Sequence, residues 1–240
     1  NSDYGTAFVL QVAYIAPNLT AENYIGMSSG VVDVNSVAQA LGSEVVFEAG
    51  QSSQIAAVFD SNSNKIVLAY QDASNSNYGT AIVGTVSGTS ISFGTAVVFE
   101  AGTTTYISIT FDSNSNKVVI AYMDNSNGEY GTAIVGTVSS TSISFGTAVV
   151  FETNKAKYNS ATFDSSSNKV VIAYAAELNS NYGTAIVGTV SGTGISFGTK
   201  VVYESASTAD VSAVFDSASN KVVVTYRDTV NSNIGTAIVG

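Results

Sequence analysis

The sequence is built on a β-rich unit that recurs every 52 residues without an insertion. The triplet Phe-Asp-Ser begins at Phe59, Phe111, Phe163 and Phe215. The hexapeptide Gly-Thr-Ala-Ile-Val-Gly begins at Gly79, Gly131, Gly183 and Gly235. A Val-Val-(Phe/Tyr)-Glu segment ends at Glu48, Glu100, Glu152 and Glu204. A period of this length, filled with short β segments, predicts a propeller or a stacked β array.

Each repeat predicts four strands, which we describe for the copy with the clearest pattern. The segments rich in β-branched and aromatic residues are Tyr106–Phe111, Lys117–Tyr122, Gly131–Val138 and a bent segment from Ser142 to Glu152. Asp112–Asn116 carries the short polar side chains typical of a turn. A longer connection is expected between one repeat and the next. Gly146 is expected to mark a bulge or bend in the fourth segment.

The second segment is apolar on both faces, because Val118 and Ile120 alternate with Val119 and Ala121. A sheet covered on both faces needs a neighbour on each side, which radially arranged blades supply. The sequence therefore predicts an all-β propeller of four-stranded antiparallel blades, with four or five blades. The propeller domain is expected at residues 34–240, with repeats near 53–104, 105–156, 157–208 and 209–240 plus 34–52, after divergent strands or a linker at 1–33.

The two ends of the chain suggest how a propeller would close. Tyr4–Val12 resembles a third strand, and Tyr24–Val32 and Val37–Glu48 resemble degenerate third and fourth strands. The last repeat stops after its third strand, so we expect Val37–Glu48 to complete it and remove the open edge. Because the chain opens and ends inside repeat motifs, we also expect it to be a segment of a longer polypeptide.

Composition excludes several classes of function. The net charge of −10 argues against nucleic acid and anionic membranes as partners. Cys, His and Trp are absent, which excludes disulfides, zinc sites and catalysis that uses His or Cys. The sequence contains no apolar run of about 18 residues, the length that predicts a membrane span. Charged residues make up only 11% of the chain, a share typical of secreted, virion or adhesive β proteins, so we expect an extracellular or virion-surface location.

A polar and aromatic cluster follows the second strand of each repeat and is the candidate ligand surface. Tyrosine rings can stack on sugars, and carboxylates accept hydroxyl hydrogen bonds. The candidate residues are Tyr70, Asp72, Tyr78, Tyr122, Asp124, Tyr130, Tyr174, Glu177, Tyr182, Tyr226 and Asp228. The alternative interpretation is structural and is favoured: the tyrosines fill space between blades and the acids close turns.

Metal and catalytic sites receive little support. Asp60–Asn64 matches the first half of a calcium loop, but no acid follows where the loop needs its last ligand, so a structural hairpin is preferred and no cofactor is expected. Glu48, Glu100, Glu152 and Glu204 recur in a ring, yet they end an outer strand and should not converge. Paired catalytic acids need unlike environments, whereas these acids recur with the period, so we assign no catalytic residue.

The repeat motifs Phe-Asp-Ser-x-Ser-Asn-Lys-Val-Val-Ile-Ala-Tyr and Ser-Ile-Ser-Phe-Gly-Thr-Ala-Val-Val-Phe-Glu resemble a tandem β repeat of uncharacterised environmental and tailed-phage proteins. Asn18–Gly26 resembles a segment that flanks those arrays. The resemblance implies a virion fibre or surface component, with other structural proteins of the same assembly or surface glycans as partners and oligomerisation left open. We therefore expect a non-enzymatic structural or adhesion module. A multivalent lectin is the alternative, and a glycoside-acting enzyme is the third.

Overall fold

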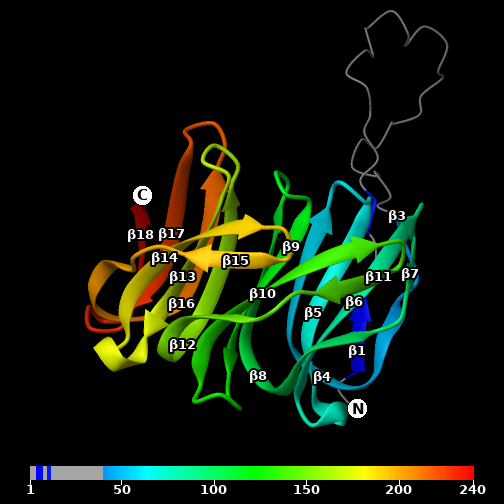
Figure 1. Ribbon diagram of the computed structural model, residues 1–240, viewed down its shortest axis with the longest axis horizontal. Helices are drawn as coiled ribbons and strands as arrows, with labels where there is room; N and C mark the ends of the chain where they lie inside the picture. Colours follow the sequence, from blue (N-terminus) through cyan, green and yellow to red (C-terminus); the bar gives the residue numbers. More distant parts are fainter. Residues whose placement is uncertain (1–3, 8–9, 12–39) are drawn as a thin grey trace, which may run out of the picture.

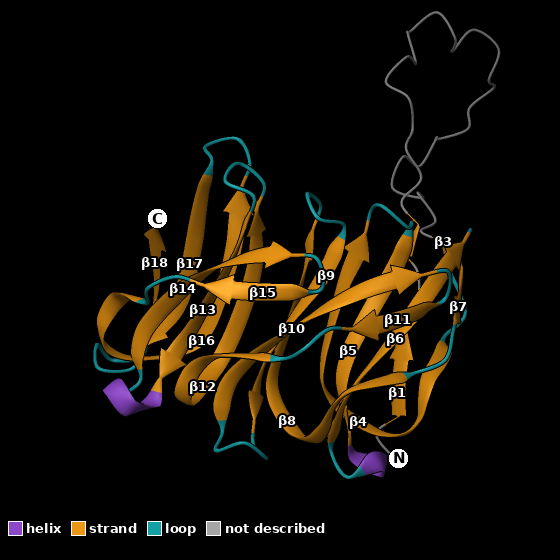
Figure 2. Ribbon diagram, viewed as in Figure 1, coloured by secondary structure: helices purple, strands orange, loops and turns teal. Residues whose placement is uncertain are grey.

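The computed structural model describes residues 4–7, 10–11 and 40–240, and most of them lie in strands (Figure 2). Each of the first three repeats contributes one long strand and three shorter ones, and the last contributes one long strand and two shorter ones. The long strands are β4 (Val45–Asp60), β8 (Val97–Asp112), β12 (Val149–Asp164) and β16 (Val201–Asp216). The second strands are β5 (Lys65–Asp72), β9 (Lys117–Asp124), β13 (Lys169–Ala176) and β17 (Lys221–Asp228).

The third strands carry the Gly-Thr-Ala motif, and short fourth strands follow three of them. The third strands are β6 (Tyr78–Ser87), β10 (Tyr130–Ser139), β14 (Tyr182–Ser191) and β18 (Ile234–Val239). The fourth strands are β7 (Ser90–Phe93), β11 (Ser142–Phe145) and β15 (Gly194–Phe197). Two 3₁₀ turns, η2 (Ala73–Asn75) and η3 (Glu177–Asn179), lie between second and third strands.

All three remaining strands lie at the N-terminal side of the array. They are β1 (Tyr4–Ala7), β2 (Leu10–Gln11) and β3 (Ala40–Leu41). β1 pairs with the start of β4, and β2 pairs with β3. Tyr4 and Gly5 lie opposite Gln51 and Glu48, the same register that Tyr78 and Gly79 hold on β8. β1 therefore acts as the third strand that Tyr4–Val12 predicts. The predicted Tyr24–Val32 strand, the predicted domain boundary near residue 34 and the Asn18–Gly26 segment lie outside the described residues.

The prediction of a closed propeller is wrong. Sixteen strands form one open antiparallel sheet that begins at β1 and ends at β18. These two edge strands lie at opposite sides of the molecule (Figure 1). The Val37–Glu48 segment is expected to complete the last repeat, but its Val45–Glu48 part is instead paired with β1. β1 occupies the edge of β4 that the last repeat would need in order to close a ring, so the two ends do not meet.

Each long strand joins two repeats, which corrects the predicted connection between them. The first half of β12 pairs with β10 of the preceding repeat, and its second half pairs with β13 of its own repeat. The β-branched threonines in segments such as Thr103–Thr105 continue the strand where loop chemistry was expected. Conversely, the predicted bent segment breaks between Phe145 and Val149, although the Gly146 amide still donates to Val135 O at 2.9 Å.

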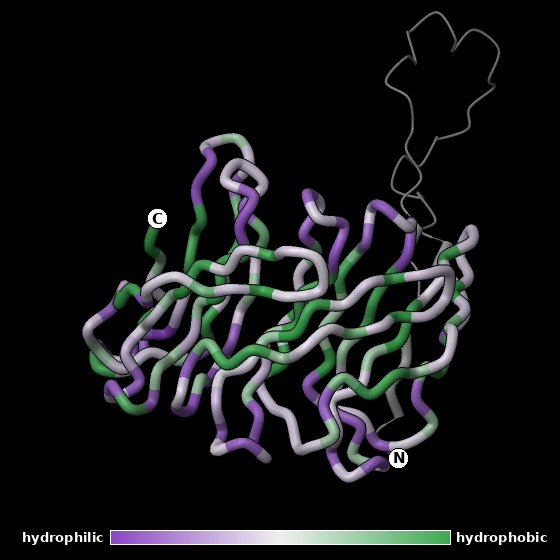
Figure 3. The backbone as a smooth tube through the Cα atoms, viewed as in Figure 1, coloured by the Kyte–Doolittle hydropathy of each residue, from purple (hydrophilic) through white to green (hydrophobic). Residues whose placement is uncertain are grey.

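Burial on both faces of the second strand is confirmed. Alternate side chains of β9 enter two different cores. Val118, Ile120 and Tyr122 pack against Val67 and Ala81 of the preceding repeat, and Val119 and Ala121 pack against Val170 and Ile172 of the following one. Successive repeats thus cover each other's faces in a row, with apolar residues along the strands and hydrophilic residues at the hairpin tips (Figure 3).

Candidate binding surface

The tyrosine at the end of each second strand is a core residue. Tyr70, Tyr122, Tyr174 and Tyr226 are all buried. Their hydroxyls donate to Glu48, Glu100, Glu152 and Glu204 at 3.1, 3.1, 3.1 and 2.9 Å, respectively. Each ring also packs at an angle on the aromatic side chain of the Val-Val-(Phe/Tyr)-Glu segment, with centroids 5.2–5.4 Å apart. The four candidates therefore lie where the structural interpretation places them, between strands.

The same pairs explain the ionisation of these groups. Burial, together with the neighbouring Glu204 carboxylate, raises the pKa of Tyr226 to about 12. Burial and the adjacent glutamates raise the pKa of Tyr70, Tyr122 and Tyr174 still further. Burial also raises the pKa of the Glu100 carboxyl. The phenols stay protonated at neutral pH and remain hydrogen-bond donors to their glutamates. The glutamates are thus engaged within their own repeats.

The candidate aspartates close turns. Asp72 Oδ1 accepts from Asn75 N at 3.1 Å and from Ser74 Oγ at 2.6 Å. Asp124 accepts from two successive backbone amides, and Asp228 does the same. The Asp60 turn, considered above as half of a calcium loop, is built alike, with Asp60 Oδ1 bound to Asn62 N and Ser63 N. Among the described residues no group of three or more metal-ligating side chains is close enough to hold an ion.

The remaining candidates differ in their surroundings. Tyr78, Tyr130 and Tyr182 are half-buried at the start of the third strands, one in each repeat. Tyr78 and Tyr130 lie opposite Asp72 and Asp124 in the sheet, which keeps each ring beside a capped turn. Glu177 instead belongs to an ion-pair network, and a hydrogen bond from Lys157 lowers the pKa of its carboxyl. Strand pairing therefore brings the candidate aspartate and tyrosine together in the repeats of Tyr78 and Tyr130.

A second group of residues, which the repeat pattern did not indicate, lies where the long strands bulge. The register shifts once in the second half of each long strand. The residues with positive φ at these bulges are Gln54, Tyr106, Tyr158 and Asp210, at 53°, 51°, 54° and 51°. An aromatic residue in this left-handed conformation is uncommon, and such strain gathers at functional positions.

Hydrogen bonds between repeats hold the bulges in line. The backbone amide of Tyr106 donates to Gln54 Oε1 at 2.9 Å, and the side-chain Nδ2 of Asn159 donates to Tyr106 O at 3.2 Å. The Tyr106 and Tyr158 rings meet at a tilt with centroids 5.0 Å apart. Both rings are half-buried, and burial raises the pKa of Tyr106. Two aromatic faces from successive repeats are thus fixed side by side.

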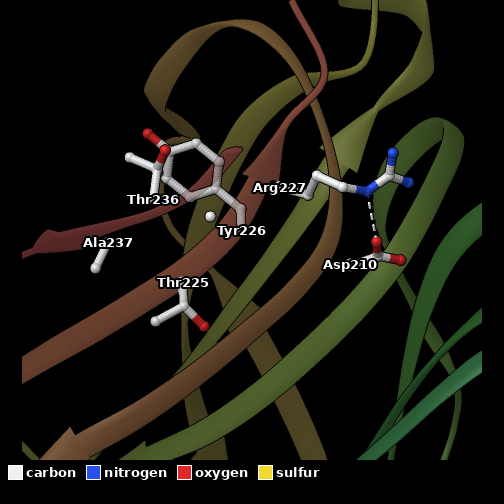
Figure 4. Close-up of a pocket in the computed structure, with 7 residues that line it drawn as sticks. Asp210, Thr225, Tyr226, Arg227, Thr236 and Ala237 are labelled. Carbon is white, nitrogen blue, oxygen red and sulfur yellow. Dashed lines mark hydrogen bonds and ion pairs between the residues drawn. The ribbon is translucent and has the colours of Figure 1, made fainter. Parts of the chain in front are cut away.

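Charges that break the repeat surround this pair. Lys155 Nζ lies 2.8 Å from Glu129 Oε2 and 3.5 Å from Glu177 Oε2, and Lys157 also binds Glu177. Arg227 Nε lies 2.7 Å from Asp210 Oδ2, the ion pair drawn in Figure 4. The corresponding positions in other repeats hold uncharged residues, such as Thr103 and Thr105 for the two lysines.

Two hollows open beside these groups. One, of about 200 Å³, is lined in part by Lys157, Tyr158 and Arg227. The other, of about 480 Å³, is lined in part by Asp210, Arg227 and Thr236 (Figure 4). We call Tyr106, Lys155, Lys157, Tyr158, Asp210 and Arg227 the bulge surface. Its aromatic faces can stack on a ring, and its charged groups can orient polar substituents. The sequence signal for this surface is that its charged and aromatic residues depart from the repeat, in a chain with only 8 basic residues.

Comparison with known proteins adds no assignment to this geometry. The helices of the described part are short turns, and none is long and apolar enough to cross a membrane. No family model matches the chain, and no curated protein matches it.

Proposed function

We propose that this chain is a non-enzymatic structural or adhesion module of a virion or cell surface, and that it contacts a protein or glycan partner through the bulge surface. The proposal is supported by a division of the polar side chains into two sets. The recurring Tyr, Glu and Asp residues are bound to one another or to turn amides within the array. The aromatic and charged residues of the bulge surface occur once or twice and lie at its exterior.

The same division argues against a catalytic role. A glycosidase needs two carboxyl groups in unlike environments that flank one bond. The recurring acids of the described repeats are each bound by a tyrosine or by backbone amides. Glu152 also pairs with Lys200, whose Nζ lies 2.9 Å from Glu152 Oε2. Three acids that break the pattern, Glu129, Glu177 and Asp210, are paired with Lys155, Lys157 and Arg227. These bonds suit a scaffold that presents a surface.

Glycan contact is the second candidate, because the Tyr106–Tyr158 pair offers two fixed aromatic faces next to charged groups. It differs from the multivalent lectin predicted by the repeats. A recurring lectin would bind once per repeat through Tyr78, Tyr130 and Tyr182, whereas the bulge surface would bind once per chain.

A glycan array screened with wild-type protein and two single variants tests this proposal. Tyr158→Ala removes one stacking face and is expected to weaken glycan binding by about tenfold, which corresponds to about 1.4 kcal/mol. Tyr182→Ala is the matched control, because it removes an equally half-buried tyrosine from the same repeat. We expect it to bind like the wild type.

Two outcomes would contradict the proposal. Loss of binding in Tyr182→Ala with full binding in Tyr158→Ala would favour the recurring lectin. Release of a shortened glycan by the purified chain would show an enzyme.

A further inference from the structure

One repeat contains a hollow whose lining departs from the pattern of the other repeats. The hollow has a volume of about 270 Å³, and its lining includes Glu152, Ala176, Leu178, Asn179 and Lys200. It lies inside the array, because the strands that contribute to it, β12, β13, β14 and β16, are each paired on both sides. None of its lining residues belongs to the bulge surface, so it is a separate candidate site.

Three of the lining residues replace side chains that other repeats use. Ala176 stands in place of the aspartate that closes the turn after the second strand, Leu178 in place of a serine, and Lys200 in place of an alanine. The corresponding residues of the preceding repeat are Asp124, Ser126 and Ala148. This repeat has therefore lost an acid and gained a base at one place.

The lost acid is a buried carboxylate in the preceding repeat. Asp124 is only 5% exposed, and its Oδ1 accepts from the second and third backbone amides that follow it, at 3.0 and 3.1 Å. Ala176 has no oxygen to offer the corresponding amides of Leu178 and Asn179, and no side chain caps this turn. Both of those residues line the hollow. The fold thus holds a carboxylate at this position in one repeat and leaves the same position open in the next.

Lys200 supplies a positive charge beside this position. Its Nζ lies 2.9 Å from Glu152 Oε2, and the Glu152 side chain is 7% exposed. An ammonium group has three hydrogens, so it can bind Glu152 and still donate to a ligand. In the preceding repeat, burial and the nearby Asp124 carboxylate raise the pKa of Glu100, with Ala148 in place of the lysine. Two carboxylates that share a lysine repel each other less than two that have none.

We propose that this hollow binds a small organic carboxylate, whose charged group takes the place of the missing aspartate and accepts hydrogen bonds from the turn amides and from Lys200 Nζ. The rest of the ligand contacts Leu178 and Val202, two exposed apolar side chains at the rim. Ligand pockets usually span about 300–1,000 Å³, so this hollow suits a molecule of a few carbon atoms and not an oligosaccharide. No other repeat of the sequence combines the alanine with the lysine, so the site occurs once in this chain.

Titration of the isotope-labelled full chain with butyrate at neutral pH, followed by amide NMR, tests the site. We expect butyrate to shift the amide signals of Leu178 and Asn179. Butyramide has a similar size and no charge, and it should leave these signals unchanged. Glucuronate is titrated in parallel, because tighter binding of glucuronate than of butyrate would identify the carboxylate as that of a sugar acid.

Two variants return the site to the pattern of the other repeats, and both should fold because those repeats hold the same residues. Ala176→Asp fills the hollow with a carboxylate of the protein itself and is expected to abolish the butyrate shifts. Lys200→Ala removes a charge-assisted hydrogen bond and is expected to weaken butyrate binding by about tenfold. Ala148→Lys is the matched control, since it adds a lysine in the preceding repeat where Asp124 is retained. It should bind butyrate like the wild type.

The double substitution Asp124→Ala/Ala148→Lys rebuilds the site in the preceding repeat. Butyrate is then expected to shift the amide signals of Ser126 and Asn127 in addition to those of the native site. Equal shifts with butyrate and butyramide, or wild-type affinity for butyrate in Ala176→Asp, would overturn the proposal. Neither result would bear on the bulge surface, which shares no residue with this hollow.

Discussion

Gly146→Ala is expected to lower the free energy of unfolding by about 3 kcal/mol, at the upper end of what overpacking usually costs. A Cβ at Gly146 would lie 1.9 Å from Thr193 O, a backbone atom in the hairpin of the next repeat. A backbone carbonyl cannot rotate out of the way, so two repeats must separate. Urea unfolding of the wild type and the variant, followed by circular dichroism, measures the change.

The control lies at the corresponding position of the third repeat. A Cβ at Gly198 would come no nearer than 3.7 Å to another atom, Val187 O. Gly198→Ala should therefore change the free energy of unfolding by less than about 1 kcal/mol. Equal destabilisation by the two substitutions would mean that repeat packing is not what requires glycine at Gly146.

Tyr122→Ala is expected to be the most damaging of the side-chain truncations, at about 3–5 kcal/mol, because it removes a fully buried ring from the core between two repeats. Tyr122→Phe keeps the ring and deletes only the hydroxyl that donates to Glu100. It should cost about 1.5–3 kcal/mol, the range for a hydrogen bond to a charged group. The difference between the two variants separates packing from hydrogen bonding.

Tyr78→Phe serves as the comparison for these variants. The Tyr78 ring is half-buried, so loss of its hydroxyl should leave the free energy of unfolding within about 0.5 kcal/mol of the wild type. The measurement is again urea unfolding. A wild-type stability for Tyr122→Phe would show that the Tyr–Glu pair does not stabilise the array.

The repeat pattern predicted the local structure well because local structure depends on residues within one period. The turn at Asp112, the apolar second strand and the Gly-Thr-Ala third strand all follow from residue type and alternation. The junction of the long strands could not be predicted, because Ala101–Thr105 contains Gly beside its β-branched threonines. Pairing with β6 on one side of the junction and with β9 on the other completes the strand.

Closure could not be predicted from the period. Neighbouring repeats make the same contacts in a ring and in a row, so the repeat alone does not separate the two. The outcome depends on which strand takes the edge of β4, and both Gly5–Ala7 and Gly235–Ala237 carry the required motif.

The repeated residues predict a candidate site at the tyrosine and aspartate of each repeat. Those residues hold the array together. The bulge surface consists of positions that depart from the repeat. Its aromatic pair depends on a bulge that no residue pattern predicts.

In this structure the repeats form an open row, and β1 caps its first long strand. Two double-cysteine variants of the full chain, oxidised at high dilution and analysed by mass spectrometry, test it directly. Ala7 lies opposite Val45 in the sheet, so Ala7→Cys/Val45→Cys is expected to form a disulfide within one chain. Ala237→Cys/Val45→Cys is expected to stay reduced in the dilute monomer. A disulfide within one chain in the second variant, and none in the first, would show a ring closed by β18 and contradict the open row.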